Sequence, residues 1–316
     1  MKWLKRVAAG LAAFVLLVVA AFFIFTRHVP FEIPAEQRPP PALLHDEGGV
    51  SVKYLGVSGY EISDGTTTIL LDPTPTRPPP SALLTGPLEP DEAYGAQKCP
   101  KADFILVNHT HFDHALDVPA IALRTKAKVI GSVSTVNLAL SRGVPAERTQ
   151  VVKAGDQVTL GTFTIDVRGS RHTDIAGISQ PMSGVVPPDA GKLWFWQFTI
   201  DETLAYRLEA KGTSIWFHPT STFAKGEVGE PGAATLIVGV TGEKQTRVKV
   251  DGLLAEAKPK RVLPTHYDNF FQPMQKGLAE MPGFDLEGPR KVFLEANPML
   301  TWITLDYDQV IYLPPD

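Results

Sequence analysis

A short segment of the sequence, NHTHFDHALD from Asn108, gathers three histidines and one aspartate within six positions. Imidazole nitrogens and carboxylate oxygens are ligands that Zn²⁺ and similar divalent ions accept. His109 and His111 are two residues apart, so their side chains point to one side of an extended segment and can bind the same ion. Asp113 and His114 follow where the chain turns into a helix, and they can bind a neighbouring ion.

The chemistry expected of this cluster is catalytic rather than structural. Structural zinc sites usually have four protein ligands that include cysteine, whereas catalytic sites leave one coordination position open. The chain has a single cysteine, Cys99, so neither a cysteine-rich metal site nor an intramolecular disulfide can form. An ion in an open site lowers the pKa of its bound water to about 7, which predicts a metal-bound hydroxide as the nucleophile. The competing interpretation is a helix cap at Asp113 beside exposed histidines, and it does not account for so many histidines at one strand end.

A buried strand must deliver the cluster, because the mostly apolar segment DFILVNH leads directly into it. Two helices are then predicted, over ALDVPAIALRT and STVNLALSRG, the second with Ser134 as its N-cap and Gly143 as its C-cap. A further helix is expected near residues 245–257. Other strands are predicted for VKYLG, GYEIS, DQVTL, FTIDVRGS, LAYRLEA, TSIWFH, LIVGV and RVLPTH. Strands and helices that both cluster and alternate indicate stacked sheets with helices outside.

A weak internal repeat indicates two related halves. YEISDGTTTILLDPT from Tyr60 and YRLEAKGTSIWFHPT from Tyr206 align without gaps, and each has an apolar strand before an x-Pro-Thr. The alignment places Asp72 opposite His218, and Asp64-Gly65 marks a hairpin turn in the first copy. We therefore expect two sheets related by a pseudo-two-fold axis, with their loops at one shared edge.

The segment HTHFDH has the form H-x-H-x-D-H and resembles the signature of the metallo-β-lactamase superfamily of metallohydrolases. The similarity covers most of residues 50–305. VKYLGVSGYEISDGTTTILLDPT from Val52, and the segment that begins GVPAERTQVVKAGDQVTLG at Gly143, look like the branch that includes ascorbate-6-phosphate lactonase and phospholipase-D-like enzymes. The resemblance implies a layered α/β fold, an αββα sandwich of two mixed sheets with helices outside and metals at one sheet edge.

The resemblance also implies metal ligands far from the cluster. His172, in GSRHTD, matches the third histidine of a first site, and His266, in RVLPTHYD, matches the last histidine of a second. Asp72, which ends an early strand, matches an acidic residue that supports the ligands by hydrogen bonding; its alternative role is that of a turn residue before proline. The implied ligands are His109, His111 and His172 for one ion, and Asp113, His114 and His266 for another.

Two departures from the family pattern reduce the charge of this ligand set. Ser221 stands where the family places the aspartate that bridges the two ions, and Val57 stands where this branch often has histidine. A second ion is therefore expected to bind more weakly than the first. Without that ion, Asp113 becomes free to orient or deprotonate the attacking water. Asp268 or Asp174 is the expected substitute if another carboxylate takes over the bridging position.

The remaining candidates lie in the second half of the chain. His218 and Asp113 are the two predicted catalytic residues. His218 precedes the altered loop and is expected to contact the substrate or leaving group, although a structural role is equally open. LWFWQF, residues 193–198, predicts either a flap that gives the site an apolar wall or an ordinary hydrophobic strand.

The N-terminal segment is expected to be a membrane anchor. Lys2, Lys5 and Arg6 precede residues 7–25, a run without charge that spans about 30 Å as a helix. The basic flank favours a cytoplasmic N-terminus, which puts the rest of the chain on the extracytoplasmic side of the cell membrane. A cleaved signal peptide is the alternative.

The expected organisation is therefore a single-pass transmembrane anchor over residues 1–27, an extended Pro-rich linker over 28–49 and a hydrolase domain over 50–316. The formal net charge of −4 does not favour nucleic acid as a partner. The predicted function is hydrolysis of an ester, lactone or phosphodiester in a small-molecule or lipid-derived substrate, with one or two zinc ions, or manganese or iron. The alternative is a non-catalytic metal-binding or sensor protein on the same fold, and a β-lactamase proper is less favoured.

Overall fold

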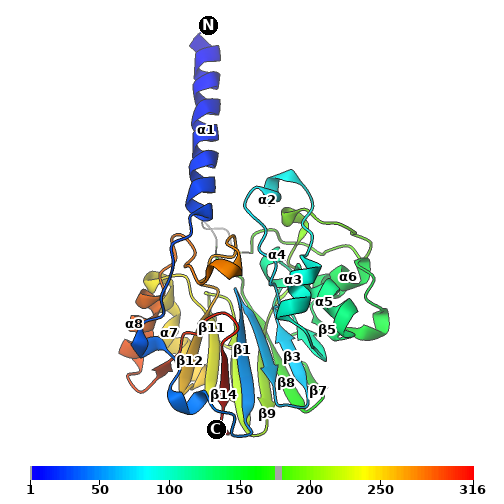
Figure 1. The fold of residues 1–316 in the computed structure, drawn as a ribbon, viewed down its shortest axis with the longest axis vertical. Coiled ribbons are helices and arrows are strands. Elements are labelled where there is room, and N and C mark those ends of the chain that lie inside the picture. Colours follow the sequence, from blue (N-terminus) through cyan, green and yellow to red (C-terminus); the bar gives the residue numbers. More distant parts are fainter. Residues whose placement is uncertain (1, 175–179) are drawn as a thin grey trace.

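Two mixed sheets lie face to face and form the body of the molecule, which is described here from a computed structural model covering residues 2–174 and 180–316 (Figure 1). The first sheet has the strand order β14 (Val310–Leu313), β1 (Val50–Gly56), β2 (Gly59–Ser63), β3 (Thr68–Leu71), β4 (Phe104–Leu106), β5 (Lys128–Gly131) and β6 (Thr149–Val151). The second has the order β13 (Thr301–Trp302), β12 (Arg261–Thr265), β11 (Thr235–Gly239), β10 (Thr213–His218), β9 (Thr203–Ala210), β8 (Phe163–Ser170) and β7 (Gln157–Leu160).

Helices cover both outer faces, which confirms the αββα sandwich (Figure 1). On one side lie α3 (Glu92–Lys98), α5 (Val118–Thr125) and α6 (Val133–Ser141); on the other lie α7 (Glu243–Ala257) and α8 (Glu287–Ala296). The shorter helices are α2 (Ala82–Thr85), α4 (Phe112–Ala115) and the 3₁₀ turns η1 (Ala35–Gln37), η2 (Pro41–Leu43), η3 (Ala146–Arg148), η4 (Phe195–Gln197) and η5 (Met274–Lys276). Large buried side chains, among them Tyr54, Trp216 and Phe217, fill the space between the sheets.

The two halves repeat one another, as the internal echo predicts. Strands β1 to β6 and strands β8 to β13 follow the same order, and in both halves two antiparallel pairings are followed by three parallel ones. Strands such as β3 and β10 are buried along their whole length, which is why they read as continuous apolar runs rather than alternating ones. Because parallel strands of a sheet end at the same edge, the loops that follow them gather there.

One helix start differs from the sequence prediction. Ser132, not Ser134, is the N-cap of α6: its backbone is extended, and its side chain accepts a hydrogen bond from the Thr135 N–H. Ser134 lies inside the helix, where its Oγ instead accepts a hydrogen bond from the backbone N–H of Val186, at 3.1 Å. The Ser134 side chain therefore ties the helix to the segment that crosses it.

The N-terminal segment forms one helix, α1 (Lys2–Thr26), which projects from the end of the sandwich near α2 (Figure 1). The expected transmembrane helix is not confirmed, since no helix in the described part of the chain is long and apolar enough to cross a membrane.

The Pro-rich segment after α1 is packed against the domain, not extended away from it as predicted. The N–H of Phe31 donates to the carbonyl of Leu278, and Leu43 joins the core. Gln37 is buried and its side chain bonds to Glu287 and Thr304. Apolar residues that alternate with the prolines give the segment enough buried surface to stay on the domain.

Candidate metal centre

Three loops bring the predicted ligands together at one edge of the sandwich. The loop between β4 and α4 carries His109 and His111, and the short helix α4 carries Asp113 and His114. His172 follows the end of β8, and His266 follows β12 directly. They form two groups, in each of which the potential ligand atoms lie within 4.8 Å of one another: His109, His111 and His172 in the first, and Asp113, His114 and His266 in the second. All six predicted ligands are thus brought into place by the fold.

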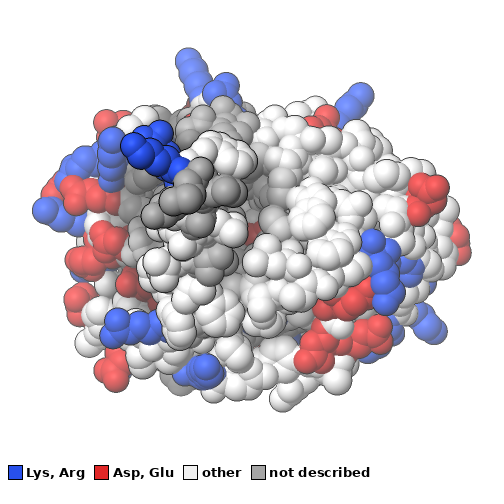
Figure 2. Space-filling view, turned by 90° about the horizontal axis from the view of Figure 1, so that it is seen from above, with Lys and Arg blue, Asp and Glu red and all other residues white. Residues whose placement is uncertain are grey.

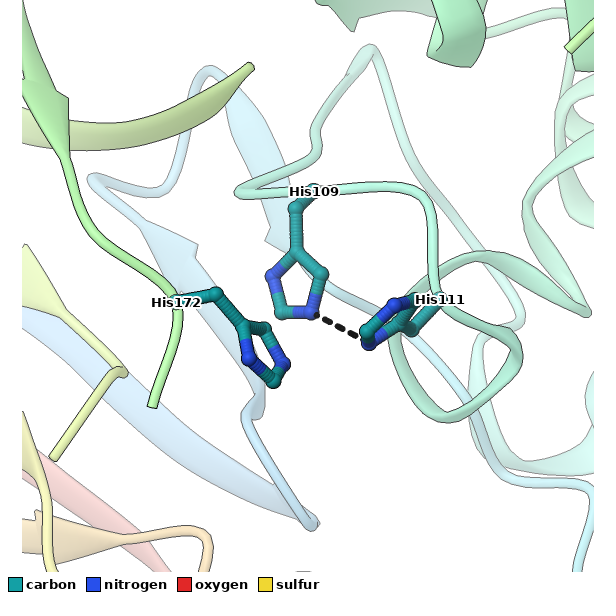
Figure 3. A group of neighbouring side chains, drawn as sticks. All are labelled: His109, His111 and His172. Atoms are coloured by element: carbon teal, nitrogen blue, oxygen red, sulfur yellow. Dashed lines mark hydrogen bonds between the residues drawn. The ribbon is translucent and has the colours of Figure 1, made fainter. Parts of the chain in front are cut away.

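The three imidazoles of the first group point toward one another (Figure 3). His109 Nε2 lies 3.2 Å from His111 Nδ1, and the ring of His172 lies 4.8 Å and 4.6 Å from these two rings. The outward-facing nitrogens of His109 and His172 make hydrogen bonds to the protein. His109 Nδ1 bonds to Asn108 Oδ1 at 2.5 Å, and His172 Nδ1 donates to the Thr173 carbonyl at 2.7 Å. This support fixes the ring orientation and leaves the inward nitrogens available to an ion.

The second group is organised around the Asp113 carboxylate. Asp113 Oδ2 lies 3.1 Å from His266 Nε2 and 3.7 Å from His114 Nε2. The other nitrogen of His114, Nδ1, bonds to Asp72 Oδ2 at 2.7 Å, and Asp72 Oδ1 accepts the Asn108 N–H at 2.6 Å. Asp72 therefore ties a ligand ring to the backbone of the cluster, as expected for a supporting carboxylate.

Backbone strain is concentrated at the same edge. Asp72, Val57 and His266 have φ angles of 41°, 52° and 61°, in the left-handed region that residues with a Cβ rarely adopt. Each such residue costs on the order of 1–3 kcal/mol and persists only where its surroundings hold it. At His266 the surroundings are visible, because its N–H donates to the Val57 carbonyl at 2.7 Å.

The electrostatics favour neutral imidazoles in the first group. Burial, reinforced by the neighbouring histidines, lowers the pKa of His109 well below its ordinary value and that of His172 to about 3. Burial also lowers the pKa of His111 to about 4. Their lone pairs are then free for metal binding near neutral pH.

The second group has the opposite balance. Burial by itself would raise the pKa of Asp113, but His114 and His266 outweigh it and hold that pKa well below its usual range. For His114, burial lowers the pKa, and the carboxylates of Asp72 and Asp113 together outweigh it and raise the pKa. The Asp113 carboxylate is therefore ionised near neutral pH.

The donor set fits divalent ions. Each group offers ligand atoms that converge, as neutral nitrogens in one case and as nitrogens with a carboxylate oxygen in the other. Hydrogen bonds from behind are a feature of metal-binding histidines in general. The metal centre is therefore rich in histidine, and its chemistry suits several first-row metals.

The bridging position holds no carboxylate. Ser221 is buried, and both its N–H and its Oγ lie 2.9 Å from Thr173 Oγ1. Asp268, one expected substitute, is turned away and buried: it accepts bonds from the Val57 N–H and from two tyrosine hydroxyls. Asp174 lines a neighbouring hollow rather than the cavity beside the two groups.

His218 lies apart from the cavity. Its ring is fully buried, with Nε2 3.0 Å from Glu227 Oε2 and 3.2 Å from Ser170 Oγ. It is absent from the described residues that line the cavity at the metal centre. Because no surface of the ring reaches the cavity, the geometry favours the structural role over the predicted contact with substrate.

A cavity of about 510 Å³ opens beside both groups, and several residues that line it were not predicted. Phe270 and Phe271 come just after the RVLPTHYD segment, and Phe112 lies inside the H-x-H-x-D-H motif itself. An aromatic pair four residues after a ligand histidine is the signal that could have found this wall. The predicted flap is partly present: residues 195–197 form a 3₁₀ turn, not a strand, and Phe195 lines the cavity.

Comparison with known proteins agrees with this geometry. The β-lactamase superfamily domain matches residues 51–266 of the chain. A UPF0173 metal-dependent hydrolase from Pyrobaculum arsenaticum is 24% identical over 70% of this chain and 85% of its own length. Another UPF0173 metal-dependent hydrolase, from Cupriavidus necator, is 28% identical over 74% of this chain and 79% of its own length. Igni18, a metallo hydrolase from Ignicoccus hospitalis, shares the fold with a TM-score of 0.55 at 18% identity, over 84% of this chain and 98% of its own. The domain match, the sandwich and the histidine-rich metal centre together establish that the chain belongs to the metallo-β-lactamase superfamily of metal-dependent hydrolases.

Proposed function

We propose that this protein hydrolyses an ester, a lactone or a phosphodiester with one or two divalent ions held at the sheet edge. The observation that carries the proposal is the pair of ligand groups that stand side by side and open onto a cavity of about 510 Å³. A divalent ion bound there supplies an activated water near neutral pH and polarises the substrate oxygen.

The chain's own residues divide the remaining tasks. We assign His109, His111 and His172 to the firmly held ion, because their imidazoles converge and stay neutral. Asp113, His114 and His266 would hold the second ion. Where that ion is absent, the ionised Asp113 carboxylate would orient the attacking water through a hydrogen bond to Oδ2.

Zinc is our first candidate for the metal, since nitrogen ligands with one carboxylate are typical of its catalytic sites. Iron or manganese would also accept this donor set, because the ion that a site takes up depends on metal availability as well as on ligand type and geometry.

A second candidate function is metal binding without turnover, as in a sensor. The observation that favours it is Ser221, whose neutral hydroxyl stands where a bridging carboxylate is expected and bonds to Thr173. Neither Asp268 nor Asp174 lines the cavity to restore that charge.

Within the described residues, the structure does not confirm a membrane span. From the sequence we nevertheless propose that residues 7–25 attach the protein to the cell membrane in a single pass, with the hydrolase domain on the extracytoplasmic side. The uncharged run after Lys2, Lys5 and Arg6 supports this. On the α1 side of the molecule, Lys, Arg, Asp and Glu gather toward the rim, and the visible middle of this face holds few of them (Figure 2). Alkaline extraction of membranes and protease treatment of intact cells test it: release by alkali, or full protection from protease, would contradict it.

Metal analysis of the full-length protein, joined to a screen of lactones, aryl esters and phosphodiesters, tests the hydrolase. We expect bound divalent metal and hydrolysis of at least one substrate class that a chelator abolishes and added metal restores. Firmly bound metal with no turnover on any of the three classes would favour the sensor. A protein that binds no divalent metal would contradict both functions.

A further inference from the structure

The cavity beside the metal centre is walled by apolar side chains. Six of them define what we call the aromatic wall: Leu83, Phe112, Phe195, Phe270, Phe271 and Phe284. Of the described residues that line the cavity, Asp113 is the only one of the aspartate, glutamate, lysine and arginine types, and it belongs to the ligand set. The cavity therefore offers a substrate apolar surface, a metal centre and a few hydroxyls.

The aromatic wall adjoins the ligands. The ring of Phe270 lies 5.8 Å from that of His266, and Phe270 also contacts Phe271 at 4.7 Å between ring centres. Phe112, placed between two ligands in the sequence, lies 6.1 Å from Phe270. Phe270 and Phe112 thus lie next to the metal ligands. A group attached directly to the reacting centre of a substrate would therefore contact the aromatic wall.

Charge argues against an anionic group beside the aromatic wall. A phosphate or carboxylate needs a guanidinium, an ammonium or backbone donors to offset its desolvation. The described lining provides no lysine or arginine. An alkyl or aryl group has no such requirement and gains from leaving water.

We infer that the substrate carries an uncharged alkyl or aryl group next to the bond that is hydrolysed, and that the aromatic wall binds it. This inference rests on the proposed hydrolase function and names the class of its substrate. The cavity volume of about 510 Å³ lies within the ~300–1,000 Å³ of small-molecule pockets, so it holds a medium-length chain or a substituted ring.

A chain-length series measures this directly. Monomeric p-nitrophenyl esters from acetate to octanoate are supplied to the metal-loaded, full-length protein, and kcat/KM is compared along the series. Each methylene that enters the wall should raise kcat/KM by about fourfold until the cavity is full. A series that is flat or falling both with the ester free in solution and with the ester embedded in vesicles would overturn the inference.

Variants locate the effect. Phe271→Ala should reduce the ratio of octanoate to acetate kcat/KM by about tenfold or more, and Phe271→Leu should restore most of it. Phe31→Ala is the matched control, because Phe31 is also a partly buried phenylalanine but lines a separate hollow near η1. An equal loss in Phe31→Ala and Phe271→Ala would contradict the assignment.

A binding arm separates this inference from the proposed function. The affinity of 1-butanol to 1-octanol is measured by calorimetry with the unmodified protein, with Phe271→Ala and with His172→Ala, the variant expected to lack turnover. Affinity that rises with chain length and falls in Phe271→Ala would support the aromatic wall even if no ester were cleaved, and only the hydrolase proposal would then fail. Alcohol affinity that does not depend on chain length would contradict binding at the aromatic wall, even if the protein hydrolysed esters.

An alkyl group of this kind occurs both in soluble esters and in membrane lipids. Presenting the octanoate ester free in solution and then embedded in phosphatidylcholine vesicles distinguishes them. A gain over acetate with the free ester identifies a soluble source, and a gain only in vesicles identifies a lipid source.

Discussion

At the scale of single residues, charge decides how many ions this centre can hold. The first group relies on neutral imidazoles, which bind one ion without needing a compensating carboxylate. The second has Asp113 alone, and Ser221 adds no charge between the two positions. Two dications about 3.5–4 Å apart repel strongly, so the missing bridge weakens the second position more than the first.

Removing a ligand of the first group should abolish turnover. His111→Ala and His172→Ala each delete a nitrogen from a site of three, and we expect kcat/KM to fall by more than about 100-fold, beyond the 10–100-fold typical of outer partners. Circular dichroism should change little. His45→Ala, which removes an exposed histidine outside the site, is the control. Undiminished hydrolysis in His111→Ala or His172→Ala would remove this group from the mechanism.

Restoring the bridging charge should increase occupancy of the second position. Ser221→Asp places a carboxylate where the family has one, and we expect metal per chain to rise and the second ion to leave more slowly to a chelator. Inductively coupled plasma analysis at limiting and excess metal gives the count. Ser221→Asn, whose new side chain matches aspartate in size but is neutral, should not raise the metal content per chain. Two tightly held ions in the unmodified protein would show that another group already bridges.

At the scale of elements, buried polar networks behind the site hold the strained loops in place. Asp268 accepts the Val57 N–H at 2.7 Å and the hydroxyls of Tyr54 and Tyr307 at 2.8 and 2.7 Å. The Val57 carbonyl in turn accepts the His266 N–H at 2.7 Å. The loop between β1 and β2 thus positions a ligand that follows β12, although the two segments are far apart in the sequence.

Disrupting this network should loosen His266. Asp268→Asn leaves an amide N–H₂ facing donors and breaks the buried pair with Arg77, at 3.4 Å, so we expect about 3–5 kcal/mol of lost stability. Occupancy of the second ion should fall more than that of the first. Asp308→Asn, which removes an exposed partner of Lys98, should cost at most about 1 kcal/mol. Urea unfolding and metal analysis measure both effects, and a normal second-ion occupancy in Asp268→Asn would argue against positioning.

The buried lysine of α7 predicts a pH dependence of stability. Burial lowers the pKa of Lys249 to about 7, and its Nζ donates to the Gly239 carbonyl at 2.8 Å. The unfolded chain binds this proton up to about pH 10.4, so stability should rise between about pH 7 and 10, by at most about 1.4 kcal/mol per pH unit. Lys249→Met should flatten this rise, whereas Lys244→Met on the exposed side of α7 should not. A rise that survives Lys249→Met would assign it elsewhere.

At the scale of the whole molecule, the segment after α1 belongs to the domain. Leu43 contributes to the core, and Gln37 makes buried hydrogen bonds to residues near the C-terminal end of the chain. Removing residues 1–27 should therefore leave a folded, metal-binding protein. Removing residues 1–47 should cost at least the roughly 1.5–3 kcal/mol of one buried leucine, and thermal unfolding compares the two. Equal melting temperatures would mean that the segment only rests on the surface.

Local pattern was sufficient for much of the architecture. Apolar runs predicted the strands, and the gap-free echo between Tyr60 and Tyr206 predicted the two halves, because burial on both faces and repeated hairpins are recorded directly in residue order. The i, i+2 spacing of His109 and His111 likewise fixed two converging ligands, since side-chain direction along an extended segment is a local property. The cap of α6 was misplaced by two residues because Ser132 and Ser134 both suit the N-cap position and the residue types alone do not separate them.

Local sequence pattern did not predict the contacts between residues that are far apart in the sequence. His172 and His266 were identified by family resemblance, and only strand pairing brings them to His109 and Asp113. The inward or outward direction of Asp268 and His218, the aromatic wall and the packed segment after α1 were decided by the tertiary structure. The physical reason is common to all of them: a residue type states which contacts a side chain can satisfy, but the partner it finds depends on which strands lie next to each other across the sheets.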